Sequence, residues 1–149
     1  MPNDSEAAQV KRARLLLDDF RNAQRRFAEA LERPADEFIR DAAIQRFEFS
    51  FELAWKAIQA MARLEGQDCA SPRMAFSTAW RNGWIADEAA WLDMLDARNK
   101  TTHTYREAIA KEVFDSLPRH LPHLTQLHES LVGRLGQIDH RSPGPASSD

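Results

Sequence analysis

The chain has 149 residues, of which 43% are hydrophobic and 29% charged, and its formal net charge at pH 7 is −3. These values are typical of one soluble globular domain and exclude a surface that is basic overall, the kind that binds nucleic acid non-specifically. The single cysteine, Cys69, excludes an internal disulfide. No apolar run approaches the roughly 20 residues of a membrane span, and the N-terminus lacks the apolar segment of a signal peptide, so we expect a cytoplasmic protein.

Two long amphipathic helices are predicted first. In residues 5–33 and 35–64, hydrophobic side chains recur every three or four positions, as on one face of a helix. Pro34 disfavours helix at the residue before it and marks the turn between the two. The first face consists of Val10, Ala13, Leu17, Phe20, Phe27 and Leu31, with Gln24 as its polar member. The second face consists of Ile44, Phe47, Phe51, Ala54, Ile58 and Met61.

Capping residues mark the shorter helices that follow. Ser71 and Pro72 are an N-cap and first-turn pair for a third helix, which Asn82-Gly83 ends. Asp87 is placed to cap a fourth helix. A fifth is predicted from about residue 107 to 135, kinked around its two prolines. Its histidines are expected on a solvent-facing side; they are His120, His123 and His128.

The expected fold is therefore all-α: an up-and-down bundle of four main helices with one short extra helix. Residues 1–139 form the single domain, and the polar tail 140–149, "HRSPGPASSD", is expected to be disordered. Phe49 and Leu53 widen the apolar surface of the second helix beyond one stripe. Either a second copy of the chain covers that surface, which makes the protein a homodimer, or the helix is enclosed at the centre of the bundle.

The stretch "DMLDARNKTTHTYREA", residues 93–108, departs from an ordinary bundle helix. At three- and four-residue spacing from Trp91, the apolar stripe reaches Arg98 and continues toward Tyr105. An arginine in such a place is either paired or lies at a cleft, because desolvating its charge is costly. Asn99 and His103 are four residues apart and can touch on one helical face, where an amide can orient an imidazole.

These residue types suit the chemistry of phosphate esters. An arginine can bind a phosphate through two parallel hydrogen bonds, and a histidine can move a proton to or from a ribose hydroxyl. Together they suffice for RNA cleavage without a metal, and no set of Asp, Glu, His or Cys has metal-ligand spacing. An isolated Arg-x4-His pair is more often a structural surface pair; Asn99 and Tyr105 beside it favour a site.

The segment "RNKTTHTY" resembles the Arg-x4-His-x-Tyr motif of HEPN-domain proteins, in particular the HepT-like, nucleotidyltransferase substrate-binding family. The resemblance extends over roughly residues 10–130. It includes "RDAAIQRFEFSFELAWKAIQ" (40–59), "SPRMAF" (71–76) and "AAWLDMLDARNKTTHTY" (89–105). It implies a HEPN-like helical bundle that dimerises, so that two copies of the motif share one cleft, and a minimal nucleotidyltransferase partner.

In the toxin–antitoxin version of this family, the HEPN member is a ribonuclease that its partner silences by transferring AMP to the motif tyrosine. Carried over to this chain, Arg98 and His103 are the catalytic residues of a metal-independent endoribonuclease. Asn99 supports His103, and Tyr105 is the AMPylated position. No cofactor is expected. The RNA substrate, the homodimer and the nucleotidyltransferase antitoxin are the expected partners, with no membrane involved.

The alternative function is a non-catalytic subunit that binds a nucleotide or another substrate for the nucleotidyltransferase. A purely structural dimeric adaptor is a third alternative. On the second predicted helix, Glu48, Glu52 and Lys56 either line the cleft or form an ordinary solvated face.

Overall fold

The computed structural model describes residues 4–141, and every regular element in this range is helical. The helices are α1 (Asp4–Glu32), α2 (Glu37–Leu64), α3 (Pro72–Arg81), α4 (Glu88–Lys100), the short 3-10 helix η1 (Thr101–His103) and α5 (Glu107–Arg141). This confirms the predicted all-α bundle. Residues 142–149, which hold most of the predicted disordered tail, lie outside the described residues, and His140 and Arg141 belong to α5.

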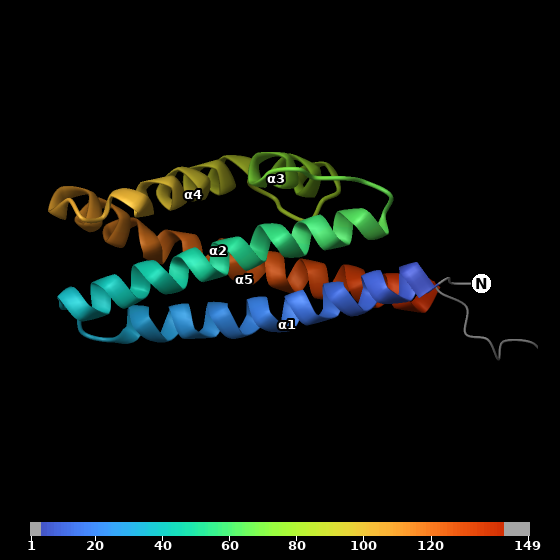
Figure 1. The fold of residues 1–149 in the computed structure, drawn as a ribbon, viewed down its shortest axis with the longest axis horizontal. Helices are drawn as coiled ribbons and strands as arrows, with labels where there is room; N and C mark the ends of the chain where they lie inside the picture. Colours follow the sequence, from blue (N-terminus) through green and yellow to red (C-terminus); the bar gives the residue numbers. More distant parts are fainter. Residues whose placement is uncertain (1–3, 142–149) are drawn as a thin grey trace, which may run out of the picture.

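The chain runs up and down the long axis of the molecule (Figure 1). α1 packs against α2 and α5, while α3 and α4 lie on the other side of α2, with α4 also packed on α5. The α1–α2 turn and η1 therefore lie at the same end of the bundle, on the left in Figure 1. This end carries the motif.

The core is a continuous series of aromatic rings between helices. The α2 face predicted from the sequence is buried throughout, from Ile44 to Met61. Ring centroids of successive neighbours are 5.0–6.3 Å apart, which is the range of favourable aromatic contacts. The series joins four helices and consists of Phe27, Phe47, Phe51, Phe76 and Trp91.

Side-chain caps fix where three helices begin. Ser71 and Asp87 accept hydrogen bonds from the backbone N–H groups of Met74 and Ala90, as predicted. Asp36 does the same for Ile39, so α2 starts two residues later than predicted. Asn82 ends α3.

The last helix differs from its prediction. It continues unbroken through Pro118 and Pro122 to residue 141, six residues beyond the predicted end. The prediction that its histidines face solvent is wrong, because α5 packs against α1, α2 and α4. His120 is fully buried, His123 is half-buried, and half-buried His128 donates from Nε2 to the Leu17 carbonyl at 3.0 Å.

Candidate functional site

The motif straddles the end of a helix. α4 ends at Lys100, η1 covers the next three residues, and α5 begins at Glu107. The hydroxyls of Thr101 and Thr102 donate to the carbonyls of Arg98 and Asn99, at 2.6 and 3.1 Å. These bonds satisfy carbonyl groups that the end of the helix leaves unpaired.

The buried face of this segment differs from the predicted stripe. The buried residues are Trp91, Met94, Ala97 and Thr101. Thr102 and Tyr105 are exposed, so the prediction that the apolar stripe continues through them is wrong. The physical reason is the change of backbone conformation after Lys100, since helical spacing no longer applies beyond it.

Arg98 is paired. Its Nη2 lies 2.6 Å from Oε2 of Glu52 on α2, and both side chains are about one-third exposed, at 33% and 35%. The guanidinium carbon is 5.3 Å from the centre of the Phe51 ring, a cation–π contact. Trp55 donates from Nε1 to Oε1 of Glu52 at 3.2 Å, so the carboxylate is held as well. Of the two possibilities that the sequence left open for Arg98, the structure shows the ion pair.

His103 and Tyr105 form an exposed pair at the bend after α4. Nδ1 of His103 lies 3.4 Å from the Tyr105 hydroxyl, and the rings meet edge to face with centroids 5.9 Å apart. The guanidinium of Arg106 lies 5.6 Å from the centre of the tyrosine ring. The Tyr105 side chain is 73% exposed. Within the described residues, no hydrogen bond joins Asn99 to His103, so the supporting role of Asn99 stays a prediction.

An open hollow of about 550 Å³ lies beside the tyrosine. It is lined from α2 and from the bend after η1 by Asp41, Ala42, Ile44, Gln45, Glu48, Thr104 and Tyr105. The three α2 residues for which the sequence left open a cleft or an ordinary solvated face have different surroundings. Glu48 lines this hollow, Glu52 holds Arg98, and Lys56 is exposed on the helix surface.

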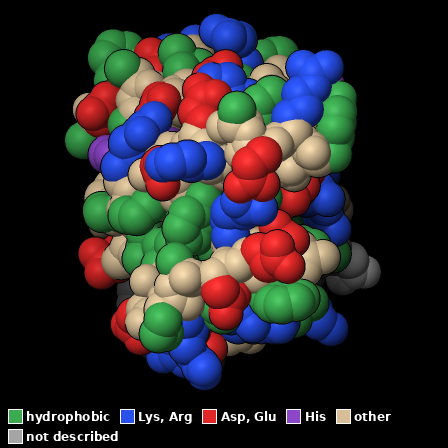
Figure 2. Space-filling view, turned by 90° about the vertical axis from the view of Figure 1, so that its left-hand side faces the viewer, with side chains coloured by type: hydrophobic (Ala, Val, Ile, Leu, Met, Phe, Trp, Pro, Cys, Tyr) green, Lys and Arg blue, Asp and Glu red, His purple; other side chains and the backbone are tan. Residues whose placement is uncertain are grey.

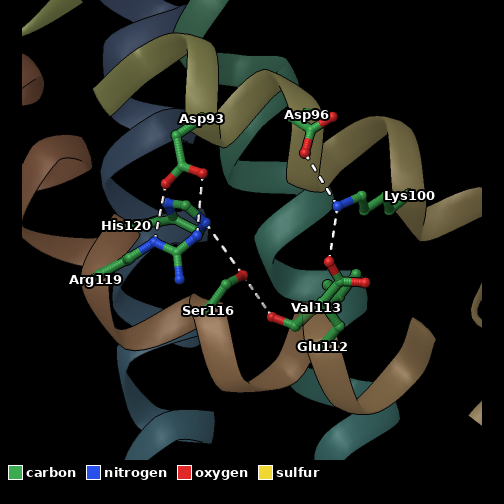
Figure 3. Close-up of polar contacts among 8 residues, drawn as sticks. All are labelled: Asp93, Asp96, Lys100, Glu112, Val113, Ser116, Arg119 and His120. Carbon is green, nitrogen blue, oxygen red and sulfur yellow. Dashed lines mark hydrogen bonds and ion pairs between the residues drawn. The ribbon is translucent and has the colours of Figure 1, made fainter. Parts of the chain in front are cut away.

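A ladder of ion pairs joins α4 to α5 next to the motif (Figure 3). Arg119 donates to both carboxylate oxygens of Asp93, at 2.9 and 3.0 Å. Lys100 lies between Asp96 and Glu112, at 3.2 and 2.8 Å. Hydrogen bonding to Arg119 lowers the pKa of Asp93, and hydrogen bonding to Glu112 and Asp96 raises the pKa of Lys100. The ladder thus fixes the half of α4 that carries the motif arginine.

His120 lies beneath this ladder and is a structural residue. Its Nε2 is 3.2 Å from the Ser116 hydroxyl, which itself donates to the Val113 carbonyl at 2.6 Å (Figure 3). The imidazole therefore donates to the serine and does not act as its base. Burial lowers the pKa of His120 to about 4, so it is neutral at pH 7. The prediction placed this residue on the solvent-facing side, although the three- and four-residue spacing of α5 places it among the buried positions.

The charge on this end of the bundle is mixed. Figure 2 shows Lys and Arg side chains interspersed with Asp and Glu around a patch of hydrophobic side chains. A long nucleic-acid backbone is bound by a continuous basic surface, because each phosphate needs a nearby cation. The charged side chains on this face do not form such a continuous basic surface.

A protein-family model, described as "Nucleotidyltransferase substrate binding protein like", matches residues 15–133. The chain belongs to this family. The matched segment contains the whole motif, including Arg98, and the α2 residue Glu52 that pairs with it. A search of curated proteins finds no match.

The solved structures that are similar to the chain include the following two. A protein from Thermus thermophilus is 38% identical, with a TM-score of 0.67, and the likeness covers 78% of this chain and 98% of that one. A protein from Haemophilus influenzae, described as having the fold of a substrate binding domain of a nucleotidyltransferase, is 24% identical with a TM-score of 0.66. Here the likeness covers 80% of this chain and 98% of that one, and at this identity it concerns the fold.

Two further findings bear on the site's surroundings. Among the described residues, no group of three or more His, Cys, Asp or Glu side chains is placed to hold a metal ion. None of the helices described is both long and apolar enough to cross a membrane.

Proposed function

We propose that this protein is the substrate-binding subunit of a nucleotidyltransferase and that it holds a nucleotide or a related phosphate-bearing substrate at Arg98. The observation that carries the proposal is the family match over residues 15–133, which includes the complete motif. The Haemophilus protein is described as having the fold of a substrate binding domain of a nucleotidyltransferase, which supports the substrate-binding part of the proposal.

The geometry suits binding better than catalysis by one protomer. Arg98 is held on Phe51 and Glu52 with its side chain one-third exposed, so its remaining N–H groups are in reach of a phosphate. Tyr105 and His103 offer exposed hydrogen-bonding groups beside an open hollow. The partner enzyme supplies the nucleotidyl-transfer chemistry in this proposal. The proposed subunit is a homodimer in which two copies of the motif share one cleft.

The test is co-expression with a minimal nucleotidyltransferase from the same organism, followed by co-purification and titration of the complex with ATP. We expect a stable complex, a dimer of this chain by light scattering, and weaker ATP binding in Arg98→Ala. Arg12→Ala, which removes an exposed arginine on α1, is the charge-matched control and is expected to bind like the wild type. Failure to form a complex, or equal affinity in both variants, contradicts the proposal.

A second candidate function is the ribonuclease toxin, and the exposed His103–Tyr105 pair favours it. A hydroxyl 3.4 Å from an imidazole and open to solvent is accessible to an enzyme that transfers AMP. AMP on Tyr105 places a phosphate against His103 and silences a catalytic histidine. In this reading, expression without the partner stops growth and fragments RNA, and His103→Ala removes the toxicity.

The two functions differ in simple measurements. The toxin function requires that the wild-type protein expressed alone stops growth. It also requires that the partner nucleotidyltransferase transfers label from α-labelled ATP to the wild-type protein and not to the Tyr105→Phe variant. The substrate-binding subunit requires harmless expression and a partner that is inactive on its own.

A further inference from the structure

The ion pair between Arg98 and Glu52 raises a question about how an anion binds here. The guanidinium donates at 2.6 Å to a carboxylate from another helix, and this is the one hydrogen bond of its side chain within the described residues. A guanidinium has five N–H groups, so most of its donors are not used by the protein. The arginine is therefore placed for a ligand, yet its charge is already balanced.

Glu52 is not a loose surface carboxylate that moves away when a ligand arrives. Trp55, three residues further along α2, donates to its other oxygen at 3.2 Å, and the carboxylate is about one-third exposed. The guanidinium of Arg98 lies over the face of the Phe51 ring, and this contact helps to hold it next to the carboxylate of Glu52. The negative charge of Glu52 stays near any anion that binds to Arg98.

We infer that Glu52 is the residue that sets the anion affinity of Arg98, acting as a built-in counter-ion against which a phosphate has to compete. This rests on the proposed function in that Arg98 is taken as the phosphate-binding group. A phosphate on the free edge of the guanidinium lies roughly 6 Å from the carboxylate, and at an effective dielectric of about 40 their repulsion weakens binding on the order of tenfold.

The inference gives a reason for the acidic neighbour beside this arginine. With Glu52 in place, an anion gains little from Arg98 through charge alone, because the pair is neutral. The repulsion from the carboxylate rises with the negative charge of the ligand. Glu52 thus lowers the affinity of Arg98 for every phosphate ligand, and hydrogen bonds to the unused N–H groups of the guanidinium have to offset that repulsion.

The experiment titrates ATP, and separately inorganic phosphate, into the purified protein by calorimetry. The variants are Glu52→Gln, Arg98→Ala and the double variant, with Glu29→Gln as a charge-matched control on an exposed α1 position. Glutamine removes the charge and keeps one of the two acceptor oxygens, so it can accept from Arg98 while the bond from Trp55 is lost. We expect Glu52→Gln to bind ATP about fivefold to tenfold more tightly. Inorganic phosphate should also bind more tightly, and the Arg98→Ala background should abolish both gains.

Equal or weaker ATP binding by Glu52→Gln overturns the inference, because the carboxylate then positions the arginine and does not compete with the ligand. A gain that persists without Arg98, or that Glu29→Gln reproduces, also overturns it. If Glu52→Gln unfolds at a lower temperature than the wild type, Glu52→Ala provides a second reading with the same expected direction. A chain that forms the nucleotidyltransferase complex but shows no effect of Glu52 fails this inference alone and leaves the proposed function standing.

Discussion

The imidazole of His120 stacks on the phenyl ring of Phe47, with ring centroids 5.4 Å apart and ring planes inclined by 26°. One ring comes from α5 and the other from α2, so the contact joins the two helices at the centre of the bundle. A neutral imidazole fits this place, whereas a charged one would be desolvated without a counter-ion in contact.

This burial makes stability depend on pH. The pKa of His120 is lowered to about 4 in the folded protein, against about 6.5 in the unfolded chain. The stabilisation is therefore fully present above pH 6.5 and is lost as the pH falls toward 4. Urea unfolding at pH 7 and pH 5 should differ by about 2 kcal/mol. Neighbouring Asp93 opposes the lowering of the pKa, and Arg119 and His123 add to it.

The control for this prediction is a pair of single variants. His120→Gln keeps a polar side chain without a titrating ring and should flatten the dependence between pH 7 and pH 5. His123→Gln, one turn further along α5, should retain it. A steep dependence in His120→Gln would mean that another group controls the transition.

The Arg119–Asp93 pair is expected to contribute little to stability but to set a carboxyl pKa. Removing the bidentate donor in Arg119→Ala should move the pKa of Asp93 upward toward its ordinary value, as followed by NMR titration. Because the pKa of Asp93 is lower in the folded protein, the pair stabilises the fold at pH values above the carboxyl pKa of the unfolded chain. This stabilisation is lost as the pH falls through the pKa of Asp93 in the folded protein. Because both side chains are largely exposed, the cost should stay below about 1 kcal/mol.

Lys111→Ala is the matched control for that pair. It breaks an ion pair with Asp115 on the same helix and should leave the Asp93 titration unchanged. A shift of Asp93 in this variant would point to a general charge effect and not to the hydrogen bonds from Arg119.

Two phenylalanines on α2 should respond very differently to truncation. Phe47 is fully buried, and Phe47→Ala should lower the free energy of unfolding by about 3–5 kcal/mol through lost burial and the cavity left behind. Phe38 is 76% exposed at the start of the helix, and Phe38→Ala should cost less than about 0.5 kcal/mol. Denaturant unfolding of both variants measures the contrast. Similar losses would contradict the described packing.

The cap of α4 is a further test, because this helix carries the motif. Asp87→Ala removes the side-chain acceptor for the Ala90 N–H and should cost about 1 kcal/mol. Asp87→Asn keeps an acceptor and should be close to the wild type. Equal loss in both would indicate that charge at the helix N-terminus matters more than the hydrogen bond.

The sequence by itself determined the helices and most of their ends. The α2 face from Ile44 to Met61 is buried as predicted, because three- and four-residue spacing is a property of one helix and needs no knowledge of its neighbours. The same holds for the caps at Ser71 and Asp87, which are bonds to a backbone N–H three residues away. The family resemblance, carried by several segments of sequence, is confirmed by the family match.

Only the tertiary structure decided what the motif residues contact. Arg98 on α4 pairs with Glu52 on α2, and the two residues are 46 positions apart in the sequence. A pattern of spacing within one helix cannot predict such a contact. The exposure of Tyr105 follows from the end of α4 at Lys100, where the helical spacing used for the prediction ceases to apply. Local spacing specifies which face of a helix is apolar, whereas the partner of a charged side chain depends on how the helices pack against one another.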